Sequence, residues 1–269
     1  DFEIFTNLAK QLGFKNSFTE NKTEREWLKY IWNESKRISK KVNLDLPDFE
    51  KFWEDGFFEV PIEKTKKIMF ENFRKNPNEN PLNTPSGKIE ITSNTIKNFN
   101  LDKCKGHPTW IEPYEWLGKI DNYPMHLISN QPEYRLHSQL DNAEYSIKNK
   151  IKNREPVLIN IEDAKEKKIK NNDIVLIFNE RGKVLAGARL TDKIMKGVLV
   201  LSTGAWFDPD YEINADLHGN PNVLTKDIGT SELSQGPTSH TCLVDIRKAK
   251  QTEIKTIKIF SKPNFKKKA

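Results

Sequence analysis

The sequence predicts an α+β protein in which a helical N-terminal region precedes a small, closed β-barrel of six strands. Apolar residues recur at helical spacing in residues 1–40, whereas from Tyr123 onward short apolar runs of strand length alternate with turn residues. Six such runs with one short helix among them would leave long unpaired edges in an open sheet. A closed barrel removes those edges and is therefore the expected architecture.

The N-terminal region is expected to contain helices that pack and carry no chemistry. An apolar stripe in residues 4–12 ends at Gly13, a residue typical of the position that follows a helix. Thr23 and Glu26 have the spacing of a capping box, in which each side chain binds a backbone N–H group of the other residue. They predict the start of a second helix, whose buried side is supplied by apolar residues between 27 and 32.

Residues 57–118 are expected to be mostly extended. Residues 57–61 are typical of a short linker strand, and residues 76–83 of a Pro- and Asn-rich connection. A Pro-Ser-Gly turn then begins an alternating strand over residues 84–91, in which Lys88 could face an anion or simply lie in a structural turn. Prolines restrict the backbone within residues 106–118 and predict a rigid, extended arm there.

Six apolar runs supply the strands of the predicted barrel. A two-turn helix over residues 162–168, begun near Asn160, follows the second run. The turn at residues 180–183 joins the third and fourth runs as an antiparallel hairpin, with Gly182 expected at a positive φ. The runs are residues 124–128, 156–161, 174–179, 184–190, 197–201 and 242–246.

Two stretches do not suit passive connections in such a barrel. Residues 129–139 follow the first run with a guanidinium, an imidazole and carboxamides, groups that bind flat ligands or phosphates, although a solvated loop is the alternative. About 40 residues without a clear element separate the fifth and sixth runs, too many for a passive loop. Their Gly, Asn, Ser and Thr residues let backbone N–H groups approach phosphate, and no acidic cluster opposes this.

Charge, cysteine content and hydropathy exclude several classes of protein. Of the net charge of +6, residues 247–269 carry +8, which leaves −2 for residues 1–246. A solvated basic tail over residues 249–269 is therefore favoured over a nucleic-acid-binding arm. Cys104 and Cys242 are isolated, so no zinc or iron–sulfur site is expected, and no apolar run is long enough to span a membrane. Asp1 already lies in a helical pattern, so a piece of a longer protein is expected.

Six segments occur in the order found in one family, the bis-molybdopterin guanine dinucleotide oxidoreductases. They most resemble its branch of trimethylamine-N-oxide, dimethyl-sulfoxide and biotin-sulfoxide reductases. The combination of Arg-Leu-His-Ser-Gln at 135–139 with Gly-Asn-Pro-Asn-Val-Leu-Thr at 219–225 is more specific than Thr-Pro-Ser-Gly-Lys-Ile-Glu at 84–90. The resemblance covers nearly the whole chain but only about the last third of a family member. The segments are residues 84–91, 106–118, 129–139, 179–182, 204–209 and 219–236.

The resemblance implies a domain organisation and a reaction. Residues 121–248 would form the C-terminal, double-psi-like barrel that covers the two dinucleotides, residues 1–120 would end the α/β catalytic body, and residues 249–269 would be the tail. The family transfers an oxygen atom from an S-oxide or N-oxide, and bis(molybdopterin guanine dinucleotide) molybdenum carries the redox chemistry. The metal ligand and the substrate funnel of the family lie further toward the N-terminus. No catalytic or metal-ligating residue is therefore expected in this chain, and the chain alone should be inactive.

The resemblance also assigns cofactor-binding roles. Ser129, Arg135 and Ser138 are expected to hold pyrophosphate or pterin oxygens, Arg135 through a charge-assisted bidentate contact. Gln131, His137 and Gln139 are expected to bind pterin edges, and His137 could tune the protonation of a pterin nitrogen. Each of these groups could instead stabilise its own loop. The expected site is completed by the backbone at Gly204 and Gly236, by Asn220 and Gln235, and by Asn222 or Asp227 as the guanine contact.

Partners and location follow from the same resemblance. The missing N-terminal part of the same enzyme, a small oxide substrate and an electron donor such as a c-type cytochrome are the expected partners of a monomeric enzyme. Trimethylamine-N-oxide reductases are exported, so a periplasmic location is expected, with the cytoplasm as the alternative for the biotin-sulfoxide type. A stand-alone barrel binding module or an inactive remnant are the competing hypotheses. Retention of the segments in residues 84–118 favours part of an enzyme.

Overall fold

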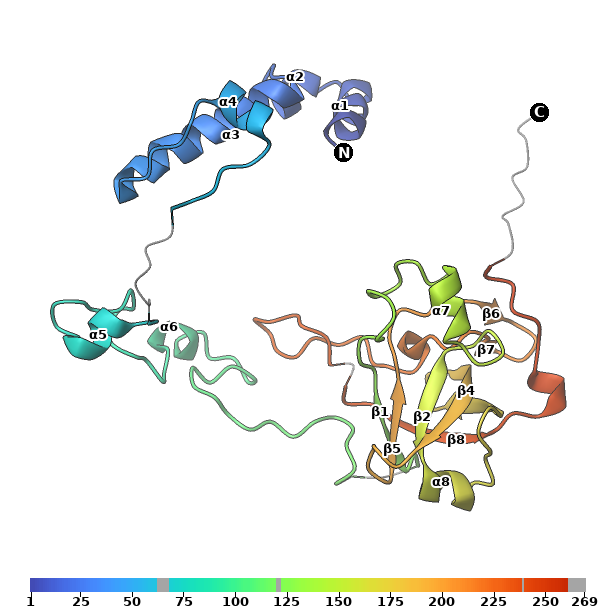
Figure 1. The fold of residues 1–269 in the computed structure, drawn as a ribbon. Helices are drawn as coiled ribbons and strands as arrows, with labels where there is room; N and C mark the ends of the chain where they lie inside the picture. The colour runs from blue at the N-terminus through green and yellow to red at the C-terminus, as the bar shows by residue number, and fades with distance from the viewer. Residues whose placement is uncertain (62–67, 120–121, 239, 261–269) are drawn as a thin grey trace, which may run out of the picture. The chain divides into compact units, whose positions relative to one another are not determined.

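The computed structural model describes residues 1–61, 68–119, 122–238 and 240–260 (Figure 1). The chain divides into two compact units, Asp1–Pro81 and Leu82–Ala269. Residues 82–119 are therefore grouped with the barrel in the structure, whereas the resemblance places them at the end of the preceding body. No helix within the described ranges has both the length and the apolar character needed to cross a membrane.

The first unit is helical, as predicted. The capping box at the start of α3 is confirmed, because Glu26 N donates to Thr23 Oγ1 at 3.3 Å and Thr23 N donates to Glu26 Oε2 at 2.7 Å. Trp32 of α3 stacks on Phe52 of α4 with ring centroids 3.7 Å apart. The helices are α1 (Phe2–Gln11), α2 (Lys15–Thr19), α3 (Glu24–Ser39), α4 (Phe49–Asp55) and α5 (Glu71–Lys75), and the 3₁₀ helix η1 (Lys40–Val42) follows α3.

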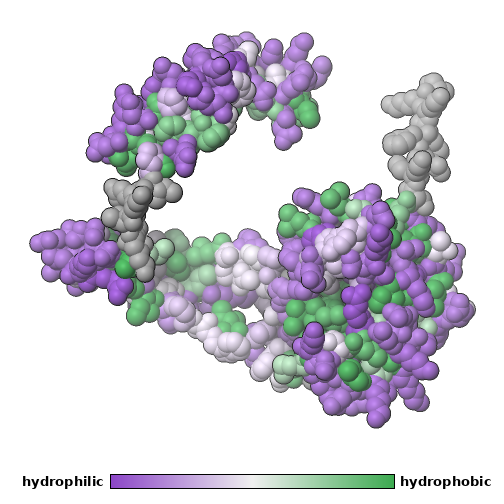
Figure 2. Space-filling model, in the orientation of Figure 1, coloured by the Kyte–Doolittle hydropathy of each residue, from purple (hydrophilic) through white to green (hydrophobic). Residues whose placement is uncertain are grey.

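Two predictions about this unit need correction. Residues 57–61 form no strand, because none of them pairs with another described segment. The apolar side of α3 is only partly buried: Trp27 and Trp32 are half-buried, whereas Leu28 and Ile31 are 38% and 56% exposed. Helical spacing identifies the helix, whereas full burial requires a packing layer, which α4 supplies beside Trp32 but not over Leu28 and Ile31. Figure 2 shows apolar residues on the visible surface of this unit.

Residues 82–119 contain a short helix, α6 (Asn94–Lys97), and otherwise turns and extended backbone. The predicted turn is present, because Gly87 N donates to Thr84 O at 2.9 Å. The strand predicted over residues 84–91 is wrong, because none of the described segments pairs with it, and Ile89 and Ile91 are 74% and 78% exposed. Residues 106–118 contain no helix, as expected for an extended arm.

The second unit contains the predicted barrel of six strands. The ring order is β2-β5-β1-β8-β3-β4, and β4 closes the ring on β2. Pairs β1–β5 and β2–β4 are parallel, and the other pairs in the ring are antiparallel, including the predicted hairpin of β3 and β4. The strands are β1 (Met125–Ile128), β2 (Pro156–Asn160), β3 (Ile174–Phe178), β4 (Lys183–Thr191), β5 (Val198–Leu201) and β8 (Leu243–Lys248).

Apolar side chains fill the barrel because alternate residues of each strand point inward. Leu127, Ile159, Ile177 and Leu199 are fully buried there. The predicted helix after β2 is confirmed as α8 (Ile161–Glu166), and Asn160 caps it by accepting a hydrogen bond from Glu162 N at 2.9 Å. The other short elements are α7 (Glu144–Lys148), β6 (Pro209–Asp210), β7 (Ala215–Asp216), and the 3₁₀ helices η2 (Pro221–Val223) and η3 (Gln251–Glu253).

Two further expectations about the barrel need correction. Gly182 does not adopt a positive φ. Glycine is required there by close approach, because a Cβ atom would lie 2.5 Å from Val223 Cγ1. The predicted solvated tail is also wrong for residues 249–260, where Lys258 N and Ile259 N donate to Asp208 Oδ2 at 2.7 and 3.1 Å. The remainder of the predicted tail lies outside the described residues.

Glu115 attaches the extended arm to the barrel. Its carboxylate accepts two hydrogen bonds from Arg181, at 2.7 and 2.9 Å, and one from Leu243 N at 2.7 Å. Lys226 Nζ lies 2.9 Å away. Burial alone would raise the pKa of Glu115, but the hydrogen bonds from Arg181, Leu243 and Lys226 outweigh it and hold the pKa at about 2, against an ordinary value of 4.5.

We expect Glu115→Gln to destabilise the protein at neutral pH and to have progressively less effect as the solution is acidified. The folded-state pKa lies below the unfolded value, so the ionised carboxylate stabilises the fold above pH 4.5 and this contribution is lost as the pH falls toward 2. The full shift sets an upper limit of about 3 kcal/mol at neutral pH, and solvent screening of this partly buried carboxylate lowers the expected effect. Urea denaturation of both proteins between pH 7 and 3 measures it. A difference that stayed constant with pH would contradict the assignment.

Candidate functional site

The topology of the barrel brings the two anomalous loops together. Strands β1 and β5 are parallel neighbours, so the loops that leave their carboxyl ends start at the same edge of the barrel. Thr203 N donates to Asn130 O at 2.9 Å, and Ser202 Oγ donates to Asn130 Oδ1 at 2.9 Å. A groove of about 620 Å³ lies between them. Its lining residues are Ser129, Gln131, His137, Ser138, Thr203, Gly204, Ala205, Trp206, Phe207, Asn220, Asn222 and His240.

Gly204 allows the two loops to touch. It has φ +88°, and a Cβ atom there would lie 1.9 Å from His137 O and 2.9 Å from Ser138 N. Those distances are far below van der Waals contact, so no other residue fits without moving the 129–139 loop. The position therefore requires glycine both for its backbone conformation and for the space.

Gln131 fixes the imidazole of His137. Its amide Nε2 lies 2.9 Å from His137 Nδ1, and its Oε1 accepts a hydrogen bond from His137 N at 3.3 Å. The second bond sets the orientation of the amide. Since an amide nitrogen only donates, Nδ1 accepts, and the neutral ring carries its proton on Nε2. Nε2–H is then the group that His137 can offer to a ligand.

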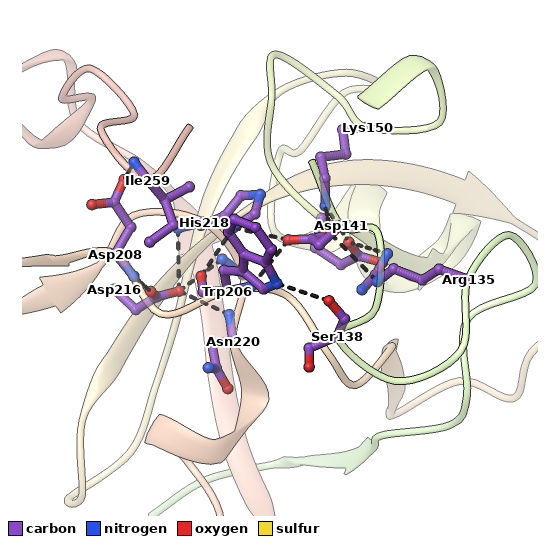
Figure 3. A network of polar contacts seen from close by, with 12 residues as sticks. Arg135, Ser138, Asp141, Lys150, Trp206, Asp208, Asp216, His218, Asn220 and Ile259 are labelled. Atoms are coloured by element: carbon purple, nitrogen blue, oxygen red, sulfur yellow. Dashed lines mark hydrogen bonds and ion pairs between the residues drawn. The ribbon is translucent and has the colours of Figure 1, made fainter. Parts of the chain in front are cut away.

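Trp206 is held at three atoms on the other wall of the groove (Figure 3). Its backbone N donates to Asp141 Oδ2 at 3.0 Å, and its backbone O lies 3.0 Å from His218 Nδ1. The indole Nε1 donates to Ser138 O at 2.8 Å. Burial lowers the pKa of His218. A neutral His218 therefore donates from Nδ1 to the carbonyl oxygen of Trp206.

A buried cluster of charges lies behind the 129–139 loop. It contains two cations, Arg135 and Lys150, and two carboxylates, Asp141 and Glu155, whose side chains are at most 1% exposed. Lys150 Nζ lies 2.7 Å from Asp141 Oδ1 and 2.9 Å from Glu155 Oε2, and Arg135 Nη1 lies 3.1 Å from Glu155 Oε2. The charges balance, as buried ion pairs require.

Arg135 was predicted to make a bidentate contact with the cofactor, but in the structure its side chain is buried and does not line the groove. Besides its carboxylate partners, the guanidinium donates to Thr203 O at 2.9 Å and to His137 O at 3.1 Å. Arg135 thus joins the two loops from behind the groove and does not line it. Sequence alone could not distinguish these roles, because the carboxylates that bury Arg135 follow it by 6 and 20 residues.

Asp216 organises the far side of the groove. Its carboxylate accepts backbone hydrogen bonds from Asp208 at 2.8 Å, Gly219 at 2.7 Å and Asn220 at 2.8 Å. Burial raises the pKa of Asp216, and these N–H groups oppose that effect. The side chain of Asn220 accepts a hydrogen bond from Asn222 N at 3.0 Å and caps η2. Asn220 and Asn222 are thereby directed to the groove.

The chain is similar to known proteins. The family described as Molydopterin dinucleotide binding domain matches residues 125–243. The chain is 44% identical over 92% of its length to trimethylamine-N-oxide reductase of Haemophilus influenzae, covering 31% of that protein, and 42% identical over 91% of its length to biotin sulfoxide reductase of Cereibacter sphaeroides, covering 33%. The chain is therefore similar to these reductases over nearly its whole length. It spans about a third of the length of these curated relatives.

A solved structure has a similar fold. Acetylene hydratase from Pelobacter acetylenicus superposes with a TM-score of 0.66 and 15% sequence identity, over 93% of this chain and 33% of the hydratase. At this identity the likeness concerns the fold alone.

The groove contains only part of the expected site. Seven expected residues line the groove: Ser129, Gln131, His137, Ser138, Gly204, Asn220 and Asn222. Gln139, Asp227, Gln235 and Gly236 do not line it; Gln235 instead donates to Ser231 O at 3.1 Å within its own loop. Five lining residues were not predicted as site residues, namely Thr203, Ala205, Trp206, Phe207 and His240. The usable signal in the sequence was that residues 203–207 follow an apolar run and begin the long region without a clear element.

The groove has the chemistry of a site for a flat, anionic ligand. Its lining offers carboxamides, hydroxyl groups, imidazoles and two aromatic rings, and no carboxylate. Within the described residues, the backbone N–H groups of Ser138, Gly204 and Ala205 donate to no protein acceptor. Thr203 Oγ1 is buried and has no hydrogen-bond partner among the described residues. Those donors and the missing acidic groups fit a nucleotide diphosphate.

The described residues offer no site for a metal ion held by protein side chains alone. No group of three or more His, Cys, Asp or Glu side chains converges anywhere within residues 1–61, 68–119, 122–238 and 240–260. Cys242 is buried, and burial raises the pKa of its thiol to about 11, which disfavours the thiolate that metals bind.

Proposed function

We propose that the groove binds the nucleotide portion of molybdopterin guanine dinucleotide, as part of a molybdenum reductase of S-oxides or N-oxides. The observation that carries the proposal is the groove itself, which lies at the carboxyl ends of parallel β1 and β5 inside the region matched to the dinucleotide-binding family. The relatives are named for trimethylamine N-oxide, dimethyl sulfoxide and biotin sulfoxide, and we propose a substrate of this class for the whole protein.

Different residues of the groove suit different parts of the ligand. Ser129, Gln131 and Asn222 present neutral donors and acceptors suited to the edges of guanine or pterin rings. His137 offers Nε2–H, and the open backbone N–H groups around Gly204 suit pyrophosphate oxygens. The bound bis(molybdopterin guanine dinucleotide) molybdenum would supply the two-electron chemistry. Contacts of Gln139, Asp227, Gln235 and Gly236 with the cofactor stay predictions that rest on the resemblance.

Finer features of the whole protein are proposed from similarity to trimethylamine-N-oxide reductases. They are a periplasmic location in anaerobic respiration, with a cytoplasmic one as the alternative, a c-type cytochrome as electron donor, and a monomeric state. We also propose that residues 121–248 form the cofactor-binding domain and that residues 1–120 end the catalytic body. The chain alone should not reduce these oxides with a reduced viologen dye, and measurable turnover by the chain would contradict this proposal.

Guanosine diphosphate should bind the 269-residue chain, with saturable amide NMR shifts at groove residues. Asn222→Ala should weaken binding at least about fivefold by removing one ring contact. Asn142→Ala is a matched control, since Asn142 is exposed and does not line the groove. Adenosine diphosphate should bind less tightly than guanosine diphosphate. Shifts scattered over the chain, or equal weakening by both substitutions, would contradict the proposed site.

A further inference from the structure

Asp141 lies behind the groove, where it connects the buried charge cluster to the groove wall. Its carboxylate is fully buried and is not among the groove lining. Oδ1 lies 2.7 Å from Lys150 Nζ, and Oδ2 accepts the backbone N–H of Trp206 at 3.0 Å. The same residue therefore touches the charge cluster on one side and the wall of the groove on the other.

We propose that Asp141 is a positioning residue that holds the Trp206 backbone, and through it the Gly204–Phe207 wall, in the geometry that binds the ligand. The inference rests on the proposed function of the groove. Asp141 itself touches no part of the ligand.

Several contacts leave the Trp206 backbone little freedom while Asp141 is in place. Asp141 holds its N–H group and His218 Nδ1 holds its carbonyl oxygen at 3.0 Å, so the peptide groups on both sides of Trp206 are oriented by buried side chains. Figure 3 shows Asp141 between Trp206 and the cations of the cluster. Gly204 and Ala205 directly precede this point and line the groove, and their N–H groups donate to no acceptor among the described residues.

Two buried cations lie against the carboxylate of Asp141. Lys150 lies at hydrogen-bonding distance and Arg135 Nε lies 3.4 Å from Oδ1. Arg135 also donates to Thr203 O, directly before Gly204. One buried network thus sets both the start and the middle of the wall. Displacements of about 1 Å in such a wall are sufficient to disrupt binding geometry.

Paired substitutions separate the hydrogen bond from the charge. Asp141→Asn with Lys150→Met removes one charge of each sign and keeps an oxygen that can accept from Trp206 N. Asp141→Leu with Lys150→Met removes the same charges and the acceptor. Asp163→Leu is the matched control, since Asp163 is also buried and accepts one loop N–H, from Gly197 at 2.7 Å, but does not line the groove.

The readouts are guanosine diphosphate affinity, hydrogen exchange at the Trp206 amide, and the unfolding midpoint of each variant. The paired variant with Asn at position 141 should keep the affinity of the unsubstituted chain within about threefold. The paired variant with Leu should lose about tenfold or more in affinity. Its Trp206 amide should also exchange hydrogen faster than in the Asn variant when the two unfolding midpoints are equal. The control should keep both affinity and exchange. Equal affinity and exchange in the two paired variants would overturn the inference.

Failure of the proposed function gives a different result. If the unsubstituted chain bound no guanosine diphosphate, the proposed ligand would be wrong. Hydrogen exchange at the Trp206 amide would then be the measurement that tests whether Asp141 positions the Trp206 backbone. Faster exchange confined to the Leu variant would support positioning by Asp141, and unchanged exchange would overturn it.

Discussion

Glu155→Gln is expected to cost about 3–5 kcal/mol of unfolding free energy, because it leaves two buried cations facing one carboxylate. Glu155 is fully buried and contacts Lys150 Nζ at 2.9 Å, Arg135 Nη1 at 3.1 Å and the Tyr134 hydroxyl at 2.7 Å. The amide of Gln fits the same space, so the loss reports the charge. Urea denaturation followed by circular dichroism measures it.

Two further variants test the physical reason. Glu166→Gln removes a carboxylate whose partner, Lys196, is on the surface, and the denaturation midpoint should hardly move because solvent screens that pair. Adding Lys150→Met to Glu155→Gln restores the balance of buried charge and should recover part of the stability. A Glu155→Gln protein as stable as the parent would mean that the cluster does not need this carboxylate to be charged.

Gly204→Val is expected to abolish nucleotide binding at the groove. The added Cβ would lie 1.9 Å from His137 O, so the two loops would have to separate. A β-branched residue at a φ of +88° is strained as well. We expect affinity for guanosine diphosphate to fall at least about a hundredfold, equivalent to about 3 kcal/mol, together with lower stability.

Gly197→Val separates the two causes. Gly197 has φ +78°, close to that of Gly204, but nothing lies within 4 Å of its added Cβ atom. Gly197→Val should therefore lose stability through backbone strain alone, without a collision between loops. Its nucleotide affinity should stay near that of the parent. Similar affinity losses in both variants would show that contact between the loops is not what the groove requires. Amide NMR titrations and denaturation midpoints provide both measurements.

The barrel was predictable because its signals are local. Each strand is a short apolar run between turn residues, and the helix at Asn160 carries its own cap. The strand predicted at residues 84–91 failed for the opposite reason. The alternation of apolar and polar residues in this segment is compatible with a strand, but a strand forms only where a neighbouring segment supplies hydrogen bonds.

The site was predictable as a pair of loops but not as a set of contacts. Polar composition singled out residues 129–139, and length singled out the region after β5, while the parallel pairing of β1 and β5 that joins them is a property of the tertiary fold. The family resemblance assigned Arg135 to the ligand, and a guanidinium in a polar loop agreed with that role. In the structure Arg135 is buried against Asp141 and Glu155 and does not line the groove, and composition alone does not predict which polar residues are buried.

The order of strands in the barrel makes the groove loop independent of the barrel's closure. The region between β5 and β8 supplies one wall of the groove, yet β5 pairs with β2 and β1, and β8 pairs with β1 and β3. Every neighbour needed to close the ring is therefore present without that loop. The length and surface side chains of this loop can therefore change while the ring of hydrogen bonds persists, whereas Leu224, which packs in the barrel core, cannot change freely.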